Sequence, residues 1–169
     1  LIDSLGSDLR ELSAACSQLA SDVALQKTID EEDVTAYQQG RVESTGFDVA
    51  DAAVEGNTPI AIINLRNALA TGTDPVLIVS ALASSFRTLA KVSGASRSVK
   101  SFELAQSMAI PPWQIDKARR QLVGWSENAM AKAVIAIAAA DADIKGAAAD
   151  PIYALERAIM TVCAARGSR

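Results

Sequence analysis

Two basic stretches in the second half of the sequence carry the side chains best suited to bind phosphate groups. The first, residues 86–100, contains four bases and no acid: Arg87, Lys91, Arg97 and Lys100. The second contains three bases within a predicted helix: Lys117, Arg119 and Arg120. Such cations position DNA without reading its sequence, because they contact the phosphate backbone. Solvated surface is the simpler interpretation of both stretches.

The second basic stretch also has the outline of a helix-turn-helix. A short predicted helix over 101–108 is followed by the turn Ile110-Pro111-Pro112 and then by the basic helix. In such motifs the second helix enters the major groove of DNA. Two prolines replace the more usual glycine, and the chain is acidic with a formal net charge of −4. Two short helices packed in a larger helical array is therefore the simpler interpretation.

Two tryptophans, Trp113 and Trp125, flank the basic helix. We expect both to pack in a core or an interface, because an indole ring buries a large apolar area. Stacking on a nucleic-acid base is an alternative that nothing else in the sequence supports.

The acidic residues do not form a plausible catalytic or metal site. Residues 30–33 are consecutive acids that lack the spacing of a calcium loop, and they fit an N-cap followed by the first turn of a helix. Asp141 and Asp143 are two residues apart, which places them about 200° apart around a helix. We therefore reject them as a catalytic pair.

The absence of histidine excludes most familiar catalytic and metal chemistry. The chain has no histidine, no phosphate-binding glycine loop and only two cysteines, Cys16 and Cys163. Serine–histidine and cysteine–histidine mechanisms and zinc sites are thus excluded, and we expect no metal and no cofactor. Both cysteines fall at apolar helical positions, so we expect buried, reduced thiols in a cytosolic protein.

Composition predicts an all-α protein. Half of the 169 residues are hydrophobic but only 4% are aromatic, and no apolar run approaches the length of a membrane span. No signal peptide is evident. Residues 1–56 carry a net charge of −9 and residues 57–169 a net charge of +5, which suggests two units with different neighbours.

Start and stop signals divide the chain into short helices. We expect helices over about 6–23, 30–40, 46–56, 58–72, 75–90, 101–108, 113–123, 126–144 and 151–163. Residues 41–45 are predicted to be a linker, 93–101 a loop and 146–149 a break. Thr58, Ser101 and Ser126 are predicted N-caps, and Asp74-Pro75 and Asp150-Pro151 are predicted helix starts.

Several segments, taken in order, resemble delta subunits of DNA polymerase III, which belong to the bacterial replicative clamp loader. The segments are Gly6–Arg10, Ile29–Val34, Phe47–Ala52 with Gly56-Asn57, Leu82–Leu89, Phe102–Ala105 with Ile110–Pro112, and Asp150-Pro151 with Ala154–Arg157. Each is weak alone, but their order and spacing are specific, and together they span nearly the whole chain.

The resemblance implies the end of an AAA+-type lid over residues 1–40 and a collar domain over 41–169. In this family a ring of collar domains holds a pentamer together, while delta opens the sliding clamp with an N-terminal domain that is absent here. The expected partners are gamma/tau and delta-prime through the collar, the sliding clamp through the absent domain, and primed DNA in the assembled complex. No membrane partner is expected.

One functional residue is implied by position in the family. Arg10 matches the lid arginine that reaches nucleotide phosphates in ATP-hydrolysing relatives. Because this chain has no phosphate-binding loop, we expect Arg10 to be vestigial or structural.

The resemblance thus predicts the non-catalytic assembly part of a cytoplasmic delta subunit, within a complex that loads the sliding clamp during DNA replication. The complex as a whole serves a DNA-directed DNA polymerase, a nucleotidyltransferase. The alternative is a helix-turn-helix DNA-binding regulator, which would expose the helix at 113–122 and bind duplex DNA sequence-specifically.

Overall fold

The computed structural model describes residues 9–23, 28–96, 98–147 and 150–167, and every regular element in those ranges is helical. This confirms the all-α prediction. The elements are α2 (Leu9–Asp22), α3 (Glu31–Val54), α4 (Thr58–Ala70), α5 (Pro75–Ser93), α6 (Ser101–Met108), α7 (Pro112–Gln121), α8 (Glu127–Ala142), the π-helical turn η1 (Asp143–Ala147) and α9 (Pro151–Ala165).

Most helices begin where the sequence predicts. Asp30 and Asp33 form a capping box at the start of α3, with each side chain 3.1 Å from the other residue's backbone nitrogen. Asp74, Ser126 and Asp150 accept backbone N–H bonds at the starts of α5, α8 and α9. These side chains satisfy amides that the first turn of a helix leaves unpaired.

Two predicted N-caps are wrong by one residue. The N-cap of α4 is Asn57, whose Oδ1 accepts a bond from the amide of Ile60, and Thr58 is the first helical residue. Lys100 precedes α6 without a side-chain cap bond, and Ser101 is already helical. The Ser101 hydroxyl instead donates to Asp116 on α7, so tertiary contact takes the place of capping.

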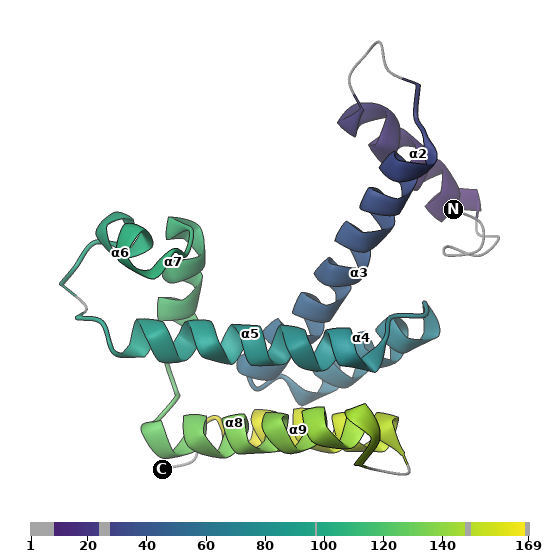
Figure 1. The fold of residues 1–169 in the computed structure, drawn as a ribbon. Helices are drawn as coiled ribbons and strands as arrows, with labels where there is room; N and C mark the ends of the chain where they lie inside the picture. Colours follow the sequence, from purple (N-terminus) through teal and green to yellow (C-terminus); the bar gives the residue numbers. More distant parts are fainter. Residues whose placement is uncertain (1–8, 24–27, 97, 148–149, 168–169) are drawn as a thin grey trace.

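The core is built around α5, which packs against α3, α7, α8 and α9 (Figure 1). Its buried residues are Ile78, Val79, Ala81, Leu82, Phe86, Leu89 and Val92. Within the described ranges, α5 is also the one helix long and apolar enough to cross a membrane. Its apolar stripe faces other helices, which is the pattern of a core helix in a bundle.

The helices form two layers. The hairpin of α8 and α9 lies beneath α4 and α5 in Figure 1, and α8 contacts α5 while α9 contacts α4. Alanines are buried on both members of the hairpin, including Ala133 and Ala140 on α8 and Ala154 and Ala158 on α9. Small side chains allow the two helices to pack closely.

The predicted linker at residues 41–45 is wrong. α3 is one continuous helix from Glu31 to Val54, and its first half extends away from the bundle toward α2 (Figure 1). Gly46, taken as a helix start, is buried within α3, where an added Cβ would lie 3.4 Å from the Cβ of Ala81. Gly46 therefore lies in the packed contact of α3 with α5 and does not break the helix.

Arg166, just after α9, joins two other parts of the bundle. Its guanidinium donates to the carbonyl of Glu55, at the end of α3, and to the carbonyl of Val123, 3.0 Å away, after α7. Gly56 has a φ of 73°, and a Cβ there would lie 3.1 Å from Cδ of Arg166. Glycine is thus required at Gly56 both by the backbone angle and by the arginine above it.

The two cysteines differ in environment. Cys163 is buried, and burial raises the pKa of its thiol, although a hydrogen bond with Thr58 opposes that rise. Cys16 is exposed on α2, so the expectation that both thiols are buried is wrong for Cys16. α2 buries Ala15 and Leu19 instead.

Candidate functional site

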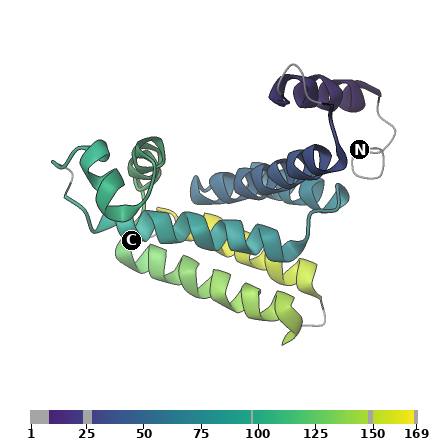
Figure 2. The same cartoon turned by 45° about the horizontal axis from the view of Figure 1, so that its top comes forward.

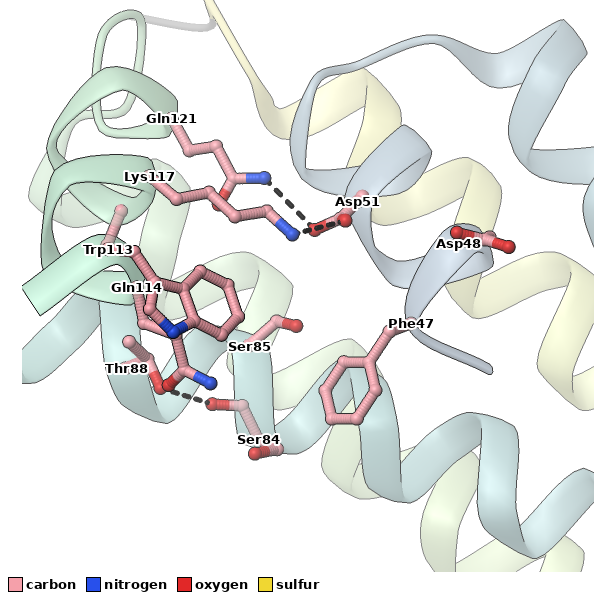
Figure 3. Close-up of a pocket in the computed structure, with 11 residues that line it drawn as sticks. Phe47, Asp48, Asp51, Ser84, Ser85, Thr88, Trp113, Gln114, Lys117 and Gln121 are labelled. Carbon is pink, nitrogen blue, oxygen red and sulfur yellow. Dashed lines mark hydrogen bonds and ion pairs between the residues drawn. The ribbon is translucent and has the colours of Figure 1, made fainter. Parts of the chain in front are cut away.

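A hollow of about 410 Å³ lies where α3, α5 and α7 meet (Figure 3). Phe47 from α3 and Trp113 from α7 stand on opposite sides of it, with 41% and 62% of their surfaces exposed. Hydroxyl side chains from α5 form one wall, namely Ser84, Ser85 and Thr88. The hollow therefore offers two accessible aromatic rings beside a polar surface.

One carboxylate fixes α7 against α3 at the edge of this hollow. Lys117 donates to Oδ2 of Asp51, and Nε2 of Gln121 donates to Oδ1 of Asp51 at 3.1 Å (Figure 3). Lys117 and Gln121 are four residues apart, so they share one face of α7 and reach the same acceptor. Gln121 is 9% exposed, and its amide depends on this contact for hydrogen bonding.

We expect Asp51→Ala to lower the free energy of unfolding by about 1–2 kcal/mol, because it leaves Lys117 and the buried Gln121 without their acceptor. Both members of the ion pair are partly exposed, which keeps the cost below that of a fully buried pair. Urea unfolding followed by circular dichroism measures this. Asp48→Ala on the same helix is the control, since Asp48 is exposed, and its cost is expected to stay within about 0.5 kcal/mol. Equal losses in the two variants would contradict the role given to Asp51.

Arg119 is also occupied within the protein. Its guanidinium donates to the carbonyl of Val99 and, at 3.3 Å, to the hydroxyl of Ser101. It thus holds the segment before α6 against α7. Two of the three bases of the predicted basic helix, Lys117 and Arg119, therefore bind protein groups.

The remaining predicted phosphate-binding residues lie on separate elements. Arg87 and Lys91 are exposed on α5, and Lys100 is exposed just before α6. Arg120 is exposed on α7 and lines a second hollow, with Glu55 and Arg166. Arg97 lies outside the described residues. Of the described candidate bases, Lys117 and Arg120 share this second hollow, whereas Arg87 lines another hollow. Their role in binding DNA remains a proposal.

Comparison with known proteins identifies the family. The family model for the C-terminal domain of the DNA polymerase III delta subunit matches residues 43–162. The chain belongs to this family. No curated protein matches the chain.

The fold agrees with this delta-subunit assignment. The Bacillus subtilis DNA clamp loader delta protein (YqeN) superimposes with a TM-score of 0.66 at 16% sequence identity. The match covers 96% of this chain and 48% of the Bacillus chain, so this chain spans about half of that protein's length. At this identity the likeness concerns the fold alone.

In this delta C-terminal domain α6 packs against α7, and α7 packs against α5. The predicted helix, Pro turn and helix are confirmed, with Ala109 in the left-handed region at φ 54° before the turn. However, Lys117 and Arg119 are partly exposed and hydrogen bond to protein groups, as described above. The family match over residues 43–162 does not favour the helix-turn-helix regulator.

Arg10, the residue matched to the lid arginine of the clamp-loader family, is exposed on the first turn of α2. α2 projects from the far end of α3, away from the layered bundle (Figure 2). Arg10 thus lies far along the chain and in space from the bases of α5 and α7, and its role stays a prediction.

The sequence did not predict that the rings of Phe47 and Trp113 in this delta domain are accessible to solvent. Trp113 is not a core residue, because most of its surface is exposed, although an interface role stays open. Trp125 does pack in the core, edge to face with Phe86 at 5.1 Å between ring centroids, and its Nε1 donates to the carbonyl of Val54. The available signal was the position of Trp113 next to Pro112 in the first turn of α7, where both residues are exposed.

Proposed function

We propose that this chain is the collar part of a clamp-loader delta subunit, which joins neighbouring subunits so that the complex loads the sliding clamp during DNA replication. The family match over residues 43–162 carries this proposal, because it covers most of the helical bundle. This chain spans about half of the Bacillus protein. In this proposal, the other half of the delta subunit opens the clamp.

Exposed apolar side chains support an assembly role. Ile60 and Ile63 on α4 and Tyr153 and Met160 on α9 are each at least 45% exposed. The two helices contact each other, and Arg66 of α4 pairs with Glu156 of α9 at 3.6 Å. An apolar surface of this kind around a polar contact is typical of protein interfaces.

Within this proposal, residues 1–40 are the end of the lid and residues 41–169 the collar. The continuous helix α3 would then cross from one to the other without a hinge. The chain itself would be non-catalytic, act beside gamma/tau and delta-prime in the cytoplasm, and contribute to a nucleotidyltransferase holoenzyme without performing its reaction.

Contact with primed DNA belongs to the assembled complex in this proposal. The exposed bases Arg87, Lys91, Lys100 and Arg120 would position phosphates, and the accessible Trp113 ring would stack on an unpaired base. Because these residues lie on different elements, we expect each contact with DNA to be weak. Binding would then require neighbouring subunits to complete the surface.

Size-exclusion chromatography with light scattering tests the assembly role. We expect the chain to co-elute with purified ATPase-type (gamma/tau) and delta-prime subunits as a complex of defined mass. Its behaviour alone is the reference. Separate elution, together with tight sequence-specific binding of duplex DNA by the chain alone, would overturn the proposal in favour of the regulator.

A further inference from the structure

The hollow between α3, α5 and α7 presents two aromatic rings to solvent. Phe47 and Trp113 stand on opposite sides of it, and Ser84 and Ser85 of α5 line it between them (Figure 3). Its volume of about 410 Å³ is within the range of roughly 300–1,000 Å³ that ligand pockets take. Covering exposed rings with an apolar group is favourable. The hollow is therefore a candidate site for a ligand with an apolar part.

The polar side chains of this hollow offer hydrogen bonds that the protein does not use. Among the described residues, no group bonds to Nε1 of Trp113, to the side-chain amide of Gln114 or to the hydroxyls of Ser84 and Ser85. An indole N–H only donates, whereas hydroxyl and amide groups donate and accept. Donors beside two aromatic rings match a ligand that combines apolar rings with carbonyl groups.

The charges that line the hollow favour a basic ligand. Asp51 is paired with Lys117, whereas the exposed carboxylate of Asp48 has no partner among the described residues. Asp48 lies beyond Asp51, on the side away from α7 (Figure 3). Two acids and one base thus leave one net negative charge, at the α3 end of the hollow.

The other charged side chains nearby leave that balance unchanged. Lys91 is exposed about one turn beyond Thr88 on the same face of α5, outside the lining of the hollow. The rest line other hollows or bind other groups: Glu55 and Arg120 beside Arg166, Arg87 between α5 and α8, Asp116 with Ser101, and Arg119 with Val99. A base on the ligand is therefore expected at the Asp48 end.

A peptide in the polyproline II conformation has the properties that this hollow requires. It makes no internal hydrogen bonds, so its carbonyls are free to accept, and its proline rings pack on aromatic side chains. Little entropy is lost on binding, because the conformation is largely preformed. A nucleic-acid strand also stacks on aromatic rings, but its phosphates would be repelled by the unpaired Asp48.

We propose that the hollow between α3, α5 and α7 binds an extended, proline-containing peptide with a basic residue at one end. The prolines pack between Phe47 and Trp113, the side chains of Gln114 and Ser85 donate to peptide carbonyls, and the base lies toward Asp48. The inference goes beyond the proposed function and does not rest on it, because this chain alone carries the whole site.

Nuclear magnetic resonance of the whole chain tests this inference, because Trp113 and Trp125 give separate indole N–H signals. The probe is a synthetic peptide with the pattern Arg-Ala-Ala-Pro-Ala-Ala-Pro and blocked termini. We expect it to shift the Trp113 signal, which is identified by its loss in Trp113→Ala. The Trp125 signal is expected to stay in place, because Trp125 packs on Phe86 and its Nε1 donates to the carbonyl of Val54.

The affinities of variants locate the peptide, followed by the backbone amide signals of the residues that line the hollow. Trp113→Ala is expected to weaken binding at least tenfold, because it removes one of the two rings. Asp48→Asn is expected to weaken it about two- to fivefold, and to leave unchanged the affinity for a peptide with alanine in place of the arginine. Phe102→Ala, which removes a ring that is 68% exposed on α6 outside the hollow, is the matched control and is expected to keep full affinity.

The outcomes are separable from those for the assembly role. All variants are first checked for unchanged thermal unfolding, which is expected because the three residues are exposed. No shift of the Trp113 signal at about 1 mM peptide would overturn the inference, as would equal affinity after Trp113→Ala or after both prolines are replaced by alanine. A shift caused by oligothymidylate and not by the peptide would assign the hollow to single-stranded DNA instead. A proline-dependent shift that Trp113→Ala weakens supports the inference, and its failure leaves the proposed function standing.

Discussion

Replacing Phe86 with alanine is expected to lower the free energy of unfolding by about 3–5 kcal/mol. Phe86 is 1% exposed at the centre of α5, and its ring meets Trp125 edge to face. Truncation removes that aromatic contact and leaves a cavity that close-packed neighbours fill only in part. Chemical denaturation followed by circular dichroism measures the loss, and the emission of Trp125 in a Trp113→Phe background reports the altered core.

Phe102→Ala is the matched control for this substitution. Phe102 is 68% exposed on α6, so the same chemical change removes little buried area, and the expected cost is within about 0.5 kcal/mol. Similar losses at Phe86 and Phe102 would show that the packing described around α5 is not the core of the protein in solution.

Two substitutions at Gly40 are expected to have opposite effects, because Gly40 lies inside the continuous helix α3. Gly40→Ala is expected to stabilise the first half of α3 by about 0.5–1 kcal/mol, since alanine loses less backbone freedom on folding. Gly40→Pro is expected to destabilise it by about 3 kcal/mol, because proline removes a helical hydrogen bond and clashes with the preceding turn.

Hydrogen exchange of the amides in residues 31–45 measures both effects at Gly40. The Pro variant is expected to lose protection by roughly a hundredfold in this segment alone, while the bundle around α5 keeps its protection. If a helix instead ended at Gly40, as the sequence predicted, and Gly40 took the left-handed conformation common at helix ends, Gly40→Ala would destabilise the segment. The sign of the alanine effect therefore decides between the two descriptions.

The structural features that the sequence predicts well are those that depend only on residues close together in the chain. Asp30, Ser126 and Asp150 begin their helices as expected because a cap depends on a side chain and an amide two or three residues away. The predicted linker at residues 41–45 was wrong because it was inferred from the low helix propensity of Gly40 and Gly46. Packing of α3 against α4 and α5 outweighs a cost of about 1 kcal/mol per glycine in a helix.

The candidate site was less predictable because its chemistry depends on distant partners. Lys117 and Arg119 look like phosphate-binding cations in sequence, yet Asp51 and Val99 occupy them from 66 and 20 residues away. No spacing rule within one helix reveals such partners. Arg87, by contrast, was identified as an exposed base and is exposed.

The arginine after α9 also has a consequence for synthesis. Arg166 joins carbonyls made 111 and 43 residues earlier, and α9 supplies buried residues to the core beside α3, α4, α5 and α8. A nascent chain on the ribosome must therefore hold its earlier helices with an open apolar face until α9 has emerged. The bundle then closes in a late step dominated by contacts between distant parts of the sequence. Chains cut short by premature termination before α9 would expose that face permanently and present it to chaperones and proteases.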